Sequence, residues 1–256
     1  MGDVFTSRLL KGGAALDDTR RVVELWDRDG APEANLRRLA SENLLGKASR
    51  SRLEDLLYWV IQRRFVEPGP HLIPALKGLL PDHQAFRDAC YYETSRADDL
   101  LAAFAEGPLW EWWEQGRLAV DVEDAIGWLE DLARAGKVPT WTDSVRRRTA
   151  QGLLSTLRDF GVLHGAAKGQ RKEIAPPSIT PRGFAYVAWR EHEQGASSRA
   201  LASSVVWRRW LLDDAMIDEM FRQTARLGVL RFSRAGSAVR VDWLVGDLAE
   251  VTGAAA

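Results

Sequence analysis

Two groups of basic residues are the part of this sequence with the clearest chemical potential: the arginines Arg146 to Arg148 and a second group around Lys168. Clustered guanidinium and ammonium groups bind phosphate oxygens and attract polyanions. Between residues 137 and 182 the chain carries nine basic and three acidic residues, whereas between 82 and 131 it carries three basic and thirteen acidic. This local segregation favours a nucleic-acid ligand, although the net charge of the whole chain is only -1. The alternative is that both runs are ordinary solvated surface.

The elements that position these basic groups follow the order helix, turn, helix and hairpin. Apolar residues at helical spacing predict a helix at 122–132 and a second helix that ends at about Phe160. Residues 161–164 and 173–175 are short strand candidates on either side of a basic, glycine-bearing tip. A winged helix-turn-helix has this order, with its second helix in the major groove and its hairpin tip near flanking phosphates. The arginines open the second helix, and the other basic group forms the tip.

The predicted DNA contacts lie at the start of that helix and at the tip. Thr142 or Ser144 can cap the helix, and hydroxyls and free N–H groups at a helix start can also bind a phosphate. An apolar stripe takes the inner face of the helix: Val145, Thr149, Leu153 and Leu157. Arg147 and Arg148 should therefore share the outer face with Gln151 and Ser155. The predicted contacts are Thr142, Ser144, Arg146, Arg147, Arg148, Gln151, Lys168, Arg171 and Lys172.

The remaining sequence is predicted to be mostly helical. Apolar residues recur at steps of three and four through 51–65, as in an amphipathic helix. A second block with the same order as the first comprises helices at 201–212 and 214–227 and strands at 229–233 and 239–244. We predict a mainly α fold, a helical N-terminal bundle followed by winged helix-turn-helix-like modules with small β-hairpins. The expected domains are a helical domain at 1–118, a winged-helix-like DNA-binding module at 119–180 and a C-terminal helix-helix-hairpin module at 181–256.

The motifs of common enzyme classes are missing from the sequence. It has no phosphate-binding P-loop, no nucleophile elbow and no dinucleotide fingerprint. A lone cysteine, Cys90, can form neither an internal disulfide nor a cysteine zinc site. The histidines are scattered without metal-ligand spacing: His71, His83, His164 and His192. We therefore predict a protein that is not an enzyme, with no catalytic residue, metal or cofactor. Charges interrupt every apolar run, which favours a cytoplasmic protein without a membrane partner.

Two N-terminal segments resemble the BrxA family. They read FTSRLLKGG at residues 5–13 and SENLLGKASRSR at residues 41–52. BrxA proteins are small accessory proteins of BREX (bacteriophage exclusion) defence systems in bacteria and archaea, and some are labelled NusB-like. The resemblance implies a helical, DNA-binding protein without known catalysis, which acts beside a methyltransferase, a large ATPase, a phosphatase-like protein and a protease-like protein. It implies no catalytic residues, and in the C-terminal half it extends only to pattern.

The second of these segments is a secondary candidate for phosphate binding. Lys47, Arg50 and Arg52 lie in a loop with small residues just before the helix at 51–65. Small residues let the backbone approach a phosphate, and a helix start adds partial positive charge. The alternative is a capping turn in which Asn43 and Ser49 satisfy backbone groups.

These observations favour a non-catalytic accessory protein of a BREX phage-defence system that binds duplex DNA with weak sequence preference. One alternative is a NusB-like RNA-binding protein. Duplex binding through an arginine-led helix would separate the two, because the A-form major groove is too narrow for a helix. The other alternative is an interaction scaffold for other BREX subunits. Its acidic face and the aromatic cluster Trp110, Trp112 and Trp113 would dock them, unless that cluster packs a domain junction.

Overall fold

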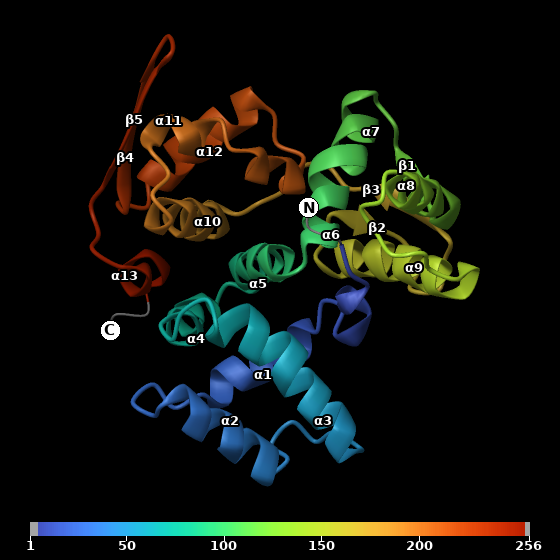
Figure 1. Ribbon diagram of the computed structural model, residues 1–256. Helices are drawn as coiled ribbons and strands as arrows, with labels where there is room; N and C mark the ends of the chain where they lie inside the picture. The colour runs from blue at the N-terminus through green and yellow to red at the C-terminus, as the bar shows by residue number, and fades with distance from the viewer. Residues whose placement is uncertain (1–4, 254–256) are drawn as a thin grey trace.

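A computed structural model describes residues 5–253 and gives a mainly helical fold with two small antiparallel sheets, as predicted (Figure 1). Residues 1–4 and 254–256 of the outer two predicted domains lie outside the described residues. The N-terminal elements are the 3₁₀ turn η1 (Arg8–Lys11), α1 (Leu16–Leu25), α2 (Pro32–Ser41), α3 (Arg50–Leu56), α4 (Leu72–Leu76), η3 (Lys77–Leu79), α5 (His83–Ala97), α6 (Asp99–Phe104) and α7 (Trp110–Glu114). No helix in the described range has the length and apolar character to cross a bilayer.

Two of these helices continue through π-helical segments. The segment η2 (Leu57–Val66) extends α3, so the predicted amphipathic helix is confirmed as one helical run. The segment η4 (Ala105–Leu109) joins α6 to α7. The helix therefore continues through Pro108, because the wider π turn accommodates a proline that cannot donate a backbone hydrogen bond.

The central elements form a three-stranded sheet with two helices. They are β1 (Ala119–Asp121), α8 (Val122–Arg134), α9 (Asp143–Asp159), β2 (Leu163–His164) and β3 (Arg171–Ile174). The helices and the β2–β3 hairpin match the prediction, whereas β1 was not foreseen because three residues are too few to show an alternating pattern. The sheet is antiparallel in the order β1-β3-β2, with Ala119 opposite Glu173 and Leu163 opposite Ile174.

The C-terminal elements repeat the order of helices followed by a hairpin. They are α10 (Pro181–Glu193), α11 (Ser198–Ala202), the 3₁₀ turn η5 (Val205–Trp210), α12 (Asp214–Ala225), β4 (Leu230–Ala235), β5 (Ala238–Trp243) and α13 (Leu248–Thr252). Both predicted strands are confirmed, but the predicted helix at 201–212 is wrong. The helix ends after Ala202 because the Trp207 ring stacks on Phe184 at 4.1 Å and its indole N–H donates to the Leu201 carbonyl at 2.6 Å.

The hydrophobic core is continuous and has α5 near its centre. Tyr91 on α5 stacks on Phe160 after α9 and meets Trp210 of η5 edge-on, both at 5.0 Å between ring centroids. The ring centroid of Tyr92, the next residue, lies 6.3 Å from that of Tyr186 of α10. The buried residues of all three predicted domains belong to this single cluster. The domain division therefore stays a prediction, since the core crosses both of its boundaries.

The acidic run at 82–131 does not form a single acidic face. Asp88, Glu93 and Asp98 are buried. Glu93 accepts hydrogen bonds from the Arg190 Nε at 2.8 Å and from the Tyr186 hydroxyl at 2.9 Å. Glu93 thus holds α5 against α10, and Asp98 caps α6 by accepting from the Leu101 N–H, so neither faces a partner. The neighbouring tryptophans are also packed: Trp110 is buried, and the Arg208 guanidinium of η5 lies 5.5 Å from its ring.

Asp88 is expected to make the protein less stable as the pH rises. Burial raises the pKa of Asp88 to about 6, against hydrogen bonds from the Thr180 N–H at 2.9 Å and hydroxyl at 3.0 Å. The carboxyl of such an aspartate binds its proton more tightly in the folded state than in the unfolded state. Its contribution to the free energy of unfolding is complete below the unfolded pKa and is lost as the pH rises through about 6. The loss is about 3 kcal/mol. Urea unfolding across this range would measure it, and an identical pH slope in Asp88→Asn would contradict the assignment.

Candidate nucleic-acid interface

The start of α9 is built as the sequence predicted. Thr142 is the N-cap, and its hydroxyl accepts a hydrogen bond from the Val145 N–H at 3.4 Å. The Ser144 hydroxyl lies 3.2 Å from the Thr142 hydroxyl, and both side chains are exposed. Val145 is half-buried, and the rest of the inner stripe is buried: Thr149, Leu153 and Leu157. The outer face of α9 is therefore fixed by the burial of the inner one.

The three arginines are in different environments. Arg146 is half-buried and donates to Glu130 of α8 at 2.8 Å, so it ties the two helices together. Arg147 is exposed and pairs with Glu123 of α8 at 2.8 Å. Arg148 is exposed and has no hydrogen-bond or ion-pair partner within residues 5–253. The outer face of α9 thus presents one unpaired guanidinium and one held in an exposed ion pair.

The hairpin tip carries two exposed cations rather than the predicted three. Lys168 and Arg171 are exposed. The prediction for Lys172 is wrong: its side chain is buried, and its ammonium donates to the carbonyls of Ala166 at 2.5 Å and Gly169 at 2.6 Å. Side chains alternate along a strand, so β3 turns Arg171 outward and Lys172 inward. Lys172 closes the tip and does not face a ligand.

The outer face of α9 and the hairpin tip adjoin one another. A pocket of about 340 Å³ lies between them, and residues of both elements and of α8 line it. Its lining includes Gln151 and Ser155 of α9 and Lys168 of the tip. Gln151 is exposed, and Ser155 is half-buried. The structure therefore places the basic tip beside the outer face of α9, at Gln151 and Ser155, which follow the arginines along the helix.

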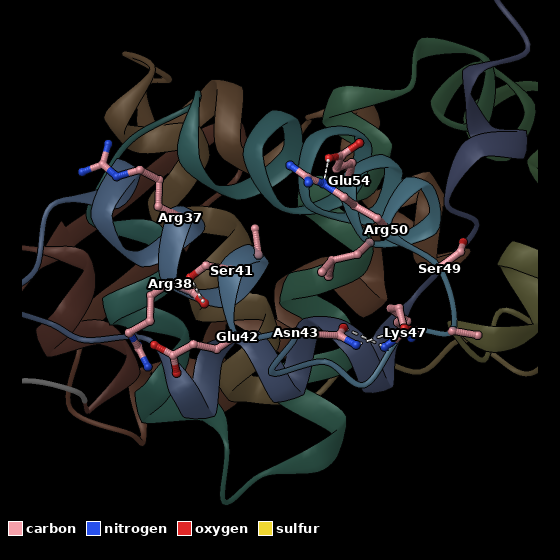
Figure 2. A pocket seen from close by; sticks show the side chains of 12 residues that line it. Arg37, Arg38, Ser41, Glu42, Asn43, Lys47, Ser49, Arg50 and Glu54 are labelled. Atoms are coloured by element: carbon pink, nitrogen blue, oxygen red, sulfur yellow. Dashed lines mark hydrogen bonds and ion pairs between the residues drawn. The ribbon is translucent and has the colours of Figure 1, made fainter.

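The secondary candidates lie on other elements: Lys47 in the loop between α2 and α3, and Arg50 and Arg52 at the start of α3 (Figures 1 and 2). Lys47 pairs with Asp18 at 2.5 Å, and Arg50 pairs with Glu54 at 2.8 Å. The Ser49 hydroxyl caps α3 by accepting from the Arg52 N–H at 3.3 Å, and Asn43 accepts from the Lys47 N–H at 2.9 Å. The capping turn that was the alternative reading is thus present. The Arg52 side chain is exposed.

This loop lines the largest of the pockets described, of about 920 Å³ (Figure 2). Four cations and two acids contribute to it: Arg37, Arg38, Lys47, Arg50, Glu42 and Glu54. The Arg38 guanidinium is already bound to the Leu25 carbonyl at 2.6 Å. Three of the four cations that line this pocket are thus held by oxygen atoms of this chain. The pocket therefore remains only a secondary candidate for phosphate binding.

A segment that the charge pattern did not single out lies beside α9. Leu10 of η1 packs on Gly152, where an added Cβ would come within 2.9 Å of its Cδ2 atom. The Phe5 N–H donates to the Lys137 carbonyl in the α8–α9 loop at 2.8 Å. This places the exposed cations Arg8 and Lys11 near the outer face of α9. Within residues 5–253, no group of three His, Cys, Asp or Glu side chains could hold a metal ion.

One comparison with known proteins identifies the family of this chain. The family model described as BrxA matches residues 4–191. A crystal structure of an uncharacterized protein from Magnetospirillum magneticum is similar in fold, with a TM-score of 0.60 and 18% sequence identity over 80% of this chain and 97% of that chain. Among curated proteins, none matches.

Proposed function

The chain belongs to the BrxA family, and we propose that it is a non-catalytic accessory protein that binds duplex DNA with weak sequence preference. Membership of this family implies a protein associated with BREX phage defence. The observation that supports DNA binding is the exposed outer face of α9, with Arg147, Arg148 and Gln151, next to Lys168 and Arg171 on the hairpin tip. We place the protein in the cytoplasm, with other BREX subunits as further partners.

In this proposal β1, α8, α9, β2 and β3 form a winged helix-turn-helix. The helix α9 would enter the major groove, and the tip of the β2–β3 hairpin would contact phosphates beside it. Few side chains on this face can form hydrogen bonds with base edges. Gln151 can bind adenine and an arginine can bind guanine, while the other contacts are to the DNA backbone. This composition accounts for the weak sequence preference.

Duplex RNA and a protein partner fit this surface less well. The narrow major groove of A-form RNA excludes a helix, so α9 could not insert there. The scaffold alternative depended on an acidic face, but Asp88, Glu93 and Asp98 of that run are buried. Three acids of α8 are exposed: Glu123 and Glu130 pair with arginines of α9, and Asp131 pairs with Arg134 of α8.

The affinity for duplex DNA is expected to fall steeply with salt. If Arg147, Arg148, Lys168 and Arg171 each neutralise a phosphate, the slope of log K against log salt is about −3.6, a loss of roughly 10²-fold between about 50 and 200 mM. Fluorescence anisotropy with one labelled duplex over this range tests the proposal. An affinity that does not change with salt would overturn it.

Replacing Lys168 and Arg171 with alanine is expected to weaken binding to all duplexes by a similar factor. Both side chains are exposed at the tip, so they contact phosphates rather than bases, and folding should not depend on them. The salt slope should become shallower by about 2. Lys172 is left in place in this variant because its buried ammonium holds the tip together. Unchanged affinity in the folded variant would show that the tip is ordinary solvated surface.

A further inference from the structure

An exposed aromatic pair lies on the helix formed by α3 and η2. The Tyr58 side chain is 42% exposed, and Trp59 beside it is half-buried. Their rings meet edge-to-face with centroids 4.8 Å apart. A large aromatic side chain left at the surface is available to pack against a ligand. The duplex-DNA surface on α9 and the hairpin does not use this pair.

Two basic side chains lie close to the Trp59 ring of this pair. The guanidinium carbons of Arg8 and Arg63 lie 5.9 and 6.0 Å from the centroid of the Trp59 ring. Arg8 makes no ion pair with any residue in the described range. The nearest carboxylates hold the other cations only loosely, with Arg63–Glu67 at 4.0 Å and Lys11–Asp55 at 3.9 Å between exposed groups. Such pairs contribute little, so these cations can exchange their carboxylates for phosphates.

The turn η1 and the glycine that follows it contact both α9 and the helix that carries the aromatic pair. Leu10 of η1 packs on Gly152, and Gly152 follows Gln151 and lies one helical turn after Arg148. Arg8 of the same turn reaches Trp59. The chain of contacts from α9 to the aromatic pair therefore passes through a single four-residue turn. A DNA strand that leaves a duplex on α9 and follows this turn would reach the aromatic pair.

We propose that Arg8, Lys11, Tyr58, Trp59 and Arg63 bind an unpaired segment of a DNA strand, so that the protein prefers junctions between duplex and single-stranded DNA. Every unpaired base can stack on an aromatic ring, and the flanking cations would bind its phosphates. The bases of a closed duplex are already stacked on one another, so an exposed tyrosine gains little there. This inference rests on the proposed duplex site only for the position of the junction.

The test compares a blunt duplex with the same duplex carrying a single-stranded oligothymidine tail at either end. The tailed duplex is expected to bind about tenfold more tightly, from stacking of one or two bases. A 2-aminopurine at the first unpaired position should lose fluorescence on binding as it stacks. Tyr58→Ala should abolish both effects and leave the affinity for the blunt duplex unchanged, whereas Tyr58→Phe should retain them. Tyr58 is exposed, so both variants should fold, which circular dichroism would verify.

Equal affinities for tailed and blunt DNA would overturn the inference, as would a tail effect that persists in Tyr58→Ala. The two proposals fail separately. If the blunt duplex does not bind but a single-stranded oligothymidine binds through Tyr58, the aromatic cluster is supported and the duplex site is wrong. If the blunt duplex binds and the tail adds nothing, the duplex site stands and the inference is wrong.

Discussion

Duplex DNA binding is expected to be lost when Arg147 and Arg148 are both replaced by glutamate, while the melting temperature changes little. Both side chains are exposed on the outer face of α9, where the double reversal replaces two positive charges with two negative ones facing the phosphates. We expect a fall in affinity of about 100-fold or more at low salt, measured by anisotropy. Folding should persist because, within residues 5–253, Glu123 is the only ion-pair partner of the two, and an exposed pair of this kind contributes about 0–1 kcal/mol.

Two further variants make this result specific. Arg21→Glu with Arg199→Glu changes the net charge by the same amount on α1 and α11, which carry none of the proposed duplex contacts, and should leave most of the affinity. Glu123→Gln should raise affinity by up to about fivefold, because it frees Arg147 from its ion pair. If the arginine reversals instead unfold the protein and the folded fraction still binds, the arginines are structural ion-pair partners of α8.

The outer face of α9 could be predicted because burial on a helix is periodic. Leu153 and Leu157 fix the inner side, and the turn of 100° per residue then places Arg147 and Arg148 outside. The hairpin followed from two short apolar segments around a glycine-bearing tip. Local spacing was sufficient for both features, and the structure confirms them.

The partners of these charges could not be predicted, because they come from other elements. Glu123 and Glu130 precede the arginines that they contact by 24 and 16 residues, and no local pattern pairs them. Lys172 illustrates the same difficulty on a strand. The prediction began this strand at residue 173 and left Lys172 in the tip, whereas β3 begins at Arg171. Because side chains alternate along a strand, Lys172 then lies on the same side as the buried Ile174.

The acidic run was misread for a related reason. Glu93 lies on α5, and Arg190, the cation that it binds, comes 97 residues later on α10. Within the sequence of α5 alone, this acid has the pattern of a surface charge. It becomes buried when α10 packs on α5. A buried carboxylate is rare unless it is paired, and the pair is visible only in the fold.

Removing Arg190 is therefore expected to destabilise the protein by about 3–5 kcal/mol. Its side chain is 5% exposed, and that of Glu93 is 0% exposed. Arg190→Met keeps much of the side-chain volume but leaves the Glu93 carboxylate buried without its main cation. Arg96 remains at 3.6 Å from the other carboxylate oxygen and can offset only part of the loss. Urea unfolding would measure the change in the free energy of unfolding.

The double variant Glu93→Leu with Arg190→Met separates the cost of an unpaired charge from the loss of packing. Replacing both members of a buried ion pair with apolar side chains is often neutral, so most of the stability should return. Tyr186→Phe, which removes only the hydroxyl that donates to Glu93 at 2.9 Å, should cost about 1–3 kcal/mol. A cost below about 1 kcal/mol for Arg190→Met alone would contradict this account. Tyr91 of α5 stacks on Phe160 after α9. The single variant should lose DNA binding only in proportion to its unfolded fraction.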